Sequence, residues 1–180
     1  KGFVGAAGQR LDELMRALGF YRGRAYGVAN IVRCRPPGNR KPNSTEIRSC
    51  IPWLADAIVN IRPRVLLLVG NTAATAILGK EKLESKIEAA RLNPVCDFSA
   101  AHPAFAQRLL AIDPKLHASG MLAIPMPHTS GLSWNGKSQK GERWSVIGTE
   151  QIRVACSLAC GRPIERQDLD KRAQQGSLDL

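Results

Sequence analysis

Three polar segments follow apolar runs of the chain, and each contains a residue type that can do chemistry. They begin at Asn30, at Gly70 with Asn71, and at His128. An asparagine amide offers both a donor and an acceptor, a glycine turn can present backbone N–H groups to an anion, and a histidine can donate a hydrogen bond to developing negative charge. Each also has a structural interpretation, because Asn and Gly cap turns and a single His is often a structural or surface residue.

Cysteine is the other residue type that can do chemistry here, and the chain has five. An odd number without a secretory signal pattern argues against a disulfide framework and favours thiols that are buried, reactive or metal-binding. Cys34 and Cys50 are separated by 16 positions. Cys156 and Cys160, four apart on one predicted helix face, are interpreted as small buried thiols, and Cys96 has no assigned role.

The chain is strongly basic. Its 26 Lys and Arg against 15 Asp and Glu give a formal net charge of +11, which attracts polyanions such as nucleic acid. A merely basic soluble protein is the alternative, since charge alone carries no sequence or chemical information. Much of the excess lies between residues 22 and 48, where the single acid is Glu46. The bases of this stretch are Arg22, Arg24, Arg33, Arg35, Arg40, Lys41 and Arg48.

Composition favours one ordinary globular domain. The chain has 180 residues, of which 44% are hydrophobic and 23% charged, as is typical of soluble proteins. The longest apolar run, residues 65–69, is far shorter than a membrane-spanning helix requires. We expect a domain over residues 1–161 and a polar tail over residues 162–180, in a monomeric, cytoplasmic protein with no membrane partner.

The elements that position these residues alternate between helices and strands. Apolar periodicity and turn residues predict helices over residues 9–18, 44–60, 73–78, 80–91, 104–112 and 145–160, and strands over residues 24–32, 64–69 and 121–125. Ser44 is the expected N-cap of the second helix, and Gly161 is expected to cap the last one. Alternation of this kind predicts an α/β sandwich around a parallel sheet, in which ligands bind at the carboxyl ends of strands.

Several of these segments together resemble family 4 uracil-DNA glycosylases. They are residues 3–9 with Leu11 and Asp12, residues 30–40, Cys50, and residues 69–73. The resemblance is almost continuous from Phe3 to about residue 79, is absent from residues 80–119, and returns at the loop that starts at His128. That loop departs from the His-Pro-Ser-like sequence usual in family 4 and is closer to loops of other branches of the superfamily.

The resemblance implies a fold and an activity. The fold is a three-layer αβα sandwich around a mostly parallel four-stranded sheet, whose first strand is expected before residue 1. The activity is base-excision repair of DNA: a flipped-out deoxyuridine loses its base by hydrolysis of the N-glycosidic bond, which releases uracil and leaves an abasic site. The alternative is a catalytically impaired or covalently trapping member of the same fold that binds uracil-containing DNA.

The resemblance also assigns roles within the site. Asn30 would read the Watson–Crick edge of uracil, and Phe3 would stack on the flipped base, although a core aromatic is its structural alternative. His128 would donate a hydrogen bond to O2 of the leaving uracil. Leu132 would be the apolar wedge in the base stack, and phosphate contacts would come from Ser130, Ser133, Gly70 and Asn71.

A four-iron four-sulfur cluster is implied as the cofactor, with Cys34 and Cys50 as two of its four ligands. The other two cysteines are expected upstream of residue 1, together with the glycine-rich loop that positions the attacking water. By this interpretation the 180 residues are an incomplete enzyme, with the base-reading and leaving-group sides of the site but not the water side.

Overall fold

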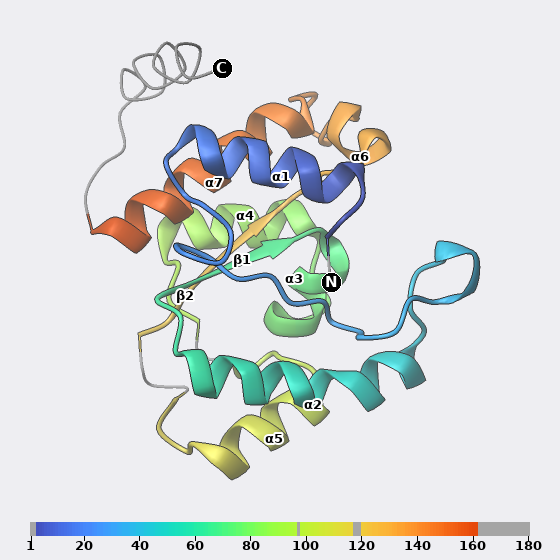
Figure 1. The fold of residues 1–180 in the computed structure, drawn as a ribbon, viewed down its shortest axis with the longest axis vertical. Helices are drawn as coiled ribbons and strands as arrows, with labels where there is room; N and C mark the ends of the chain where they lie inside the picture. The colour runs from blue at the N-terminus through green and yellow to red at the C-terminus, as the bar shows by residue number, and fades with distance from the viewer. Residues whose placement is uncertain (1–2, 97, 117–119, 162–180) are drawn as a thin grey trace. The chain divides into compact units, whose positions relative to one another are not determined.

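The computed structural model describes residues 3–96, 98–116 and 120–161. The chain forms two compact units: a terminal unit made of Lys1–Val28 and Met126–Leu180, and a central unit made of Ala29–Pro125. Figure 1 shows the elements of both. None of the described helices is long and apolar enough to cross a bilayer.

The central unit contains the sheet. Strands β1 (Val65–Val69) and β2 (Leu122–Met126) are hydrogen-bonded neighbours and run parallel (Figure 1), and both lie within one residue of their predicted bounds. Gly70 follows β1 with φ +87°, in the region that favours glycine, and the chain turns there into α3 (Asn71–Leu78). The predicted strand, glycine turn and helix are thereby confirmed.

Two long helices of the central unit, α2 (Ser44–Ile61) and α5 (Pro103–Ile112), pack side by side (Figure 1). Their apolar faces meet β1 and α3 in one core, in which Ile51 and Phe105 are fully buried. Helix α4 (Leu83–Leu92) lies against α3, within the region predicted to be helical.

The terminal unit contains α1 (Ala6–Ala17), the short α6 (Gly131–Asn135) and α7 (Trp144–Cys160). Helices α1 and α7 are in contact, and the Cys156 thiol lies 3.8 Å from the sulfur of Met15 between them. Gly161 caps α7 with φ +67°, as predicted. Burial raises the pKa of Cys156 to about 12, as expected for the buried packing thiol that the sequence indicated. The same prediction was wrong for Cys160, which is exposed at the last position of α7, where the helix ends.

The predicted α/β class is confirmed, but several finer predictions differ from the structure. The sheet of the described residues has two strands, whereas the resemblance implies four. Residues 24–32 form no strand: Tyr26 makes one isolated bridge with Arg22, and the apolar side chains of the run have no neighbouring strand among the described residues. The N-cap of α2 is Asn43 rather than the predicted Ser44, because the Asn43 side chain and the Glu46 side chain each bind the other residue's backbone N–H.

The predicted tail lies outside the described residues, so the domain boundary at residue 161 stays a prediction.

Candidate active site

His128 lies in the loop that joins β2 to α6. Its side chain is half-buried, and its Nδ1 accepts a hydrogen bond of 3.1 Å from the backbone N–H of Ser130. Ser130 is in turn the N-cap residue of α6, so the start of this helix and the orientation of the imidazole are set together. The ring therefore has a fixed direction before any ligand binds.

The environment of His128 favours the neutral imidazole. Burial lowers its pKa below the ordinary value, because a charged ring loses hydration there. Since Nδ1 accepts a hydrogen bond, the ring proton of the neutral form resides on Nε2. His128 is thus an uncharged donor at neutral pH, and its Nε2–H has no hydrogen-bond acceptor among the described residues.

Phe3 lies next to this imidazole. The two ring centroids are 6.2 Å apart with an angle of 41° between the planes. The Phe3 backbone has φ +54°, which a bulky residue rarely adopts, and the Arg22 guanidinium donates to its carbonyl at 3.2 Å. Gly8 permits this approach, because a Cβ there would lie 1.9 Å from the Phe3 carbonyl oxygen.

Two hydrogen bonds hold the His128 loop against α1. The fully buried Thr129 hydroxyl donates to the carbonyl of Ala7 at 2.7 Å, and Arg10 donates to the carbonyl of Thr129, also at 2.7 Å. Arg10 and Thr129 were missed by the sequence analysis. They join positions 119 residues apart, and no local pattern signals such a bond.

Asp12 anchors the arginine that holds Phe3. Its carboxylate accepts hydrogen bonds from Arg22 Nε at 2.9 Å and from the Tyr26 hydroxyl. Burial, followed by the hydrogen bond to Asp12, raises the pKa of Tyr26 to about 12, so the phenol stays protonated as a donor. Asp12 belongs to the segment that carries the family resemblance, and the structure gives it a positioning role.

Helix α6 carries three further predicted site residues. Leu132 projects from it with 93% of its surface exposed, which is unusual for a leucine. Ser130 and Ser133 are half-buried, and their hydroxyls are 3.4 Å apart. The structure therefore brings Phe3, His128 and the two serines together in the terminal unit.

The other predicted site residues belong to the central unit. Asn30 is exposed in a segment without regular secondary structure, not at the end of a strand as predicted. Gly70 is buried at the turn after β1, and Asn71 is exposed at the first position of α3. The turn thus places a helix N-terminus at the carboxyl end of a strand, where anions commonly bind.

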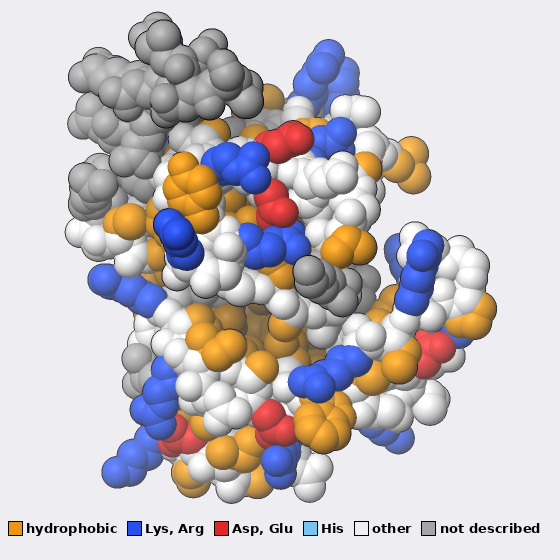
Figure 2. Space-filling model, in the orientation of Figure 1, with side chains coloured by type: hydrophobic (Ala, Val, Ile, Leu, Met, Phe, Trp, Pro, Cys, Tyr) orange, Lys and Arg blue, Asp and Glu red, His pale blue; other side chains and the backbone are white. Residues whose placement is uncertain are grey.

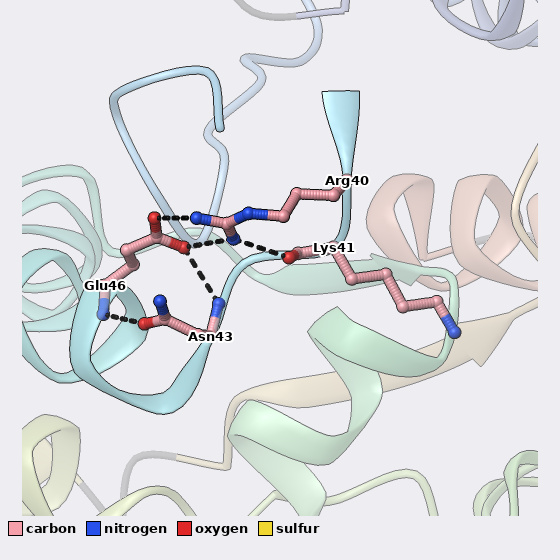
Figure 3. Close-up of polar contacts among 4 residues, drawn as sticks. All are labelled: Arg40, Lys41, Asn43 and Glu46. Carbon is pink, nitrogen blue, oxygen red and sulfur yellow. Dashed lines mark hydrogen bonds and ion pairs between the residues drawn. The ribbon is translucent and has the colours of Figure 1, made fainter. Parts of the chain in front are cut away.

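The predicted metal ligands flank a loop that is firmly held (Figure 3). The Asn43 side chain caps α2 by accepting from Glu46 N at 2.8 Å, and the Glu46 carboxylate accepts from Asn43 N at 2.8 Å. Arg40 adds a two-pronged ion pair to the same carboxylate at 2.7 and 2.9 Å. The hydrogen bond from Arg40, and after it the one from the Asn43 backbone, lowers the pKa of Glu46 to about 2.

The two cysteines do not form a complete cluster site. Cys34 is exposed before this loop, and Cys50 is half-buried in α2, both as free thiols. Within the described part of the chain no group of three or more His, Cys, Asp or Glu side chains could hold a metal. A four-iron cluster needs four thiolates, so these residues supply at most half of the set.

Known proteins with similar sequences belong to one superfamily. A family model described as "Uracil DNA glycosylase superfamily" matches residues 1–147. A type-4 uracil-DNA glycosylase of Pyrobaculum aerophilum is 43% identical over 76 residues, covering 42% of this chain and 38% of the relative. Type-4 uracil-DNA glycosylases of Archaeoglobus fulgidus and Thermotoga maritima are each 39% identical, over 82 and 93 residues; these matches cover 46% and 52% of this chain and 41% and 47% of the relatives.

The chain thus spans less than half the length of the curated relatives that it matches. The match to the superfamily, in contrast, extends over most of the chain and includes the Phe3 segment and the His128 loop. The resemblance noted from the sequence is confirmed: the chain belongs to the uracil-DNA glycosylase superfamily.

Proposed function

We propose that this chain carries the base-binding and leaving-group side of a uracil-DNA glycosylase that repairs DNA by base excision. The observation that carries the proposal is the state of His128: a half-buried, neutral imidazole whose Nδ1 is occupied and whose Nε2–H is free to donate. The type-4 uracil-DNA glycosylases similar to this chain support the choice of substrate.

The reaction breaks the bond between C1′ of deoxyribose and N1 of uracil. The bond electrons pass to the base and spread onto its O2, while water supplies the oxygen that bonds to C1′ and loses a proton; the released uracil anion takes up one proton, which completes the hydrolysis. Nε2–H of His128 would donate to O2 as its charge grows, and a fixed donor of this kind lowers the barrier because it needs no reorganisation. Phe3, beside that imidazole, would stack on the flipped base.

The remaining predicted roles are proposed on position and exposure. The exposed amide of Asn30 can pair with a uracil edge, and Leu132 can enter the stack that the base has left. Phosphates of uracil-containing DNA would meet Ser130 and Ser133 at α6 and the backbone at Gly70 and Asn71. We expect a monomer that acts beside the chromosome in the cytoplasm.

We also propose that Cys34 and Cys50 are two ligands of a 4Fe-4S cluster in the natural-length protein. Two features support this: both thiols are free, and the Arg40–Glu46 contacts fix the chain between them. The role would be structural, because a cluster there would clamp the loop to α2.

The test is the release of free uracil from a single-uracil oligonucleotide by the natural-length protein, measured with an otherwise identical thymine strand as control. Release from the uracil strand, with alkali-labile abasic sites in equal amount, is the expected result. A protein–DNA band that survives denaturation would instead assign the covalently trapping activity. Neither release nor adduct by folded protein would contradict the proposal.

A further inference from the structure

An exposed tryptophan of α2 is not used by the proposed reaction. Trp53 has 53% of its surface accessible, and the Arg33 guanidinium lies 5.0 Å from the centroid of its ring. Arg33 precedes Cys34 and is itself exposed. The guanidinium thus covers one face of an exposed ring in a cation–π contact, and the part of the ring that stays exposed can serve as a stacking platform next to a positive charge.

Further basic residues lie in the segment that connects Arg33 to α2. Arg33, Arg35 and Lys41 are all exposed, and among the described residues of the segment 33–48, Arg40 is the base that forms an ion pair, with Glu46. That pair neutralises the single acid of the segment. Figure 2 shows blue basic side chains and orange apolar ones next to each other over α2.

The platform is also rigid. Glu46 and Trp53 are seven residues apart in α2 and therefore lie on one face of the helix, about 10 Å apart along its axis. Arg40 is hydrogen-bonded to Glu46, and Arg33 contacts the ring of Trp53. Because the approaching segment is fixed in advance, little ordering is required when a ligand binds.

We propose that Trp53 and Arg33 form a binding surface for single-stranded DNA, separate from uracil recognition. An unpaired base stacks on the exposed part of the Trp53 ring, while Arg33, Arg35 and Lys41 neutralise neighbouring phosphates. A single strand is the partner because the faces of a base in a duplex are covered by its neighbours, whereas an unpaired base offers a free face. This contact requires no uracil and goes beyond the proposed function.

The experiment uses the full chain and a thymine-only oligonucleotide, with affinity measured by fluorescence anisotropy of the labelled strand. Trp53→Ala should weaken binding about tenfold, and Trp53→Phe, which keeps a stacking ring, should stay within about threefold of wild type. Titration of wild type should quench tryptophan fluorescence, and Trp53→Phe should lose this quenching. Arg33→Ala should reduce the slope of log K against log salt by about 0.7, the loss of one phosphate contact.

Arg16→Ala is the matched control, because it removes one exposed positive charge from α1 in the terminal unit; it should leave the quenching intact. Thermal melts of all variants establish that they are folded. Equal affinity of Trp53→Ala and wild type would overturn the proposal, and so would an equal loss of affinity for blunt duplex DNA. Since the strand carries no uracil, a failure here leaves the glycosylase proposal standing, and an inactive glycosylase leaves this one standing.

Discussion

Protonation of His128 is opposed by two features of its surroundings. Burial removes hydration from the charged ring, and a proton on Nδ1 would displace the hydrogen bond from Ser130. Both keep the ring neutral as the pH falls past the ordinary histidine pKa of about 6.5. Because the charge of His128 does not change around neutral pH, the hydrogen bond that it donates should not change in strength there either.

The corresponding prediction concerns pH. The imidazole ¹⁵N resonances of His128 should show the Nε2–H tautomer at pH 7 and should titrate below pH 6.5. Because the folded pKa is depressed, the unfolded chain takes up this proton first, so the stability contributed by His128 is complete above pH 6.5 and is lost as the pH falls through the folded pKa. An Nδ1–H tautomer, or a pKa above 6.5, would contradict the described geometry.

At the scale of elements, the entry to α1 depends on one glycine. A Gly-to-Ala change inside a helix usually stabilises it by about 1 kcal/mol, but a methyl group on Gly8 would collide with the Phe3 carbonyl. Gly8→Ala should therefore destabilise the protein by about 1–3 kcal/mol and displace Phe3. Gly27→Ala is the control, since nothing lies within 4 Å of a Cβ there. Denaturant unfolding measures the stability of both variants. Equal stabilities would contradict the close approach of Gly8 to the Phe3 carbonyl.

The N-terminus of α2 gives a second prediction of this kind. Asn43 makes the capping box with Glu46, so Asn43→Ala should cost about 1 kcal/mol in the free energy of unfolding. Ser44→Ala, one position later, should cost much less because its side chain does not cap the helix. Urea denaturation of the two variants compares them directly. A larger loss of stability in Ser44→Ala than in Asn43→Ala would contradict the observed N-cap and support Ser44 instead.

Local signals explain which elements could be predicted. The apolar run of β1 and the glycine after α7 act within a few residues, and both elements lie where the sequence put them. Helix α6 has five residues, too few for a helical period to show, and it was predicted as a loop. The strand predicted over residues 24–32 is absent. A strand must pair with a neighbouring strand, and no local sequence pattern shows whether one is present.

The candidate site divides in the same way. His128, Phe3 and Asn30 could be named from motif resemblance, because these residues lie in short segments with a characteristic order. The groups that hold two of them could not: Arg10 contacts the loop from α1, and Arg22 reaches the Phe3 carbonyl. Such hydrogen bonds form only when the elements pack together, and the sequence does not show which way either side chain points.

At the scale of the whole molecule, the charge and the cysteines make separate contributions. The net charge of +11 favours association with DNA whatever its sequence, whereas Cys34 and Cys50 are free thiols whose proposed role is to bind a cluster. Within the described part of the chain no group of three or more His, Cys, Asp or Glu side chains could hold a metal, so a 4Fe-4S cluster would need ligands from other residues.

This gives a spectroscopic prediction. The natural-length protein, purified without oxygen, should show a broad visible band from sulfur-to-iron charge transfer, and Cys34→Ala should lose the band and melt at a lower temperature. Cys160→Ala, which removes another exposed thiol, should keep both properties. A colourless wild type would remove the cluster proposal and leave the His128 loop as the guide to the branch of the superfamily.

The central claim, that His128 donates to the leaving base, is tested most directly by a comparison of two histidines. His102 caps α5, and its Nδ1 accepts from Ala104 N at 3.3 Å, the same local contact that His128 makes with the residue two positions on. The measurement is the single-turnover rate of uracil excision by the natural-length protein with saturating enzyme.

His128→Ala should lower this rate by about a hundred- to a thousandfold, the cost of losing one preorganised donor, whereas His102→Ala should stay close to wild type. Equal rates for His128→Ala and wild type, or an equal loss in both variants, would contradict the proposed role of His128.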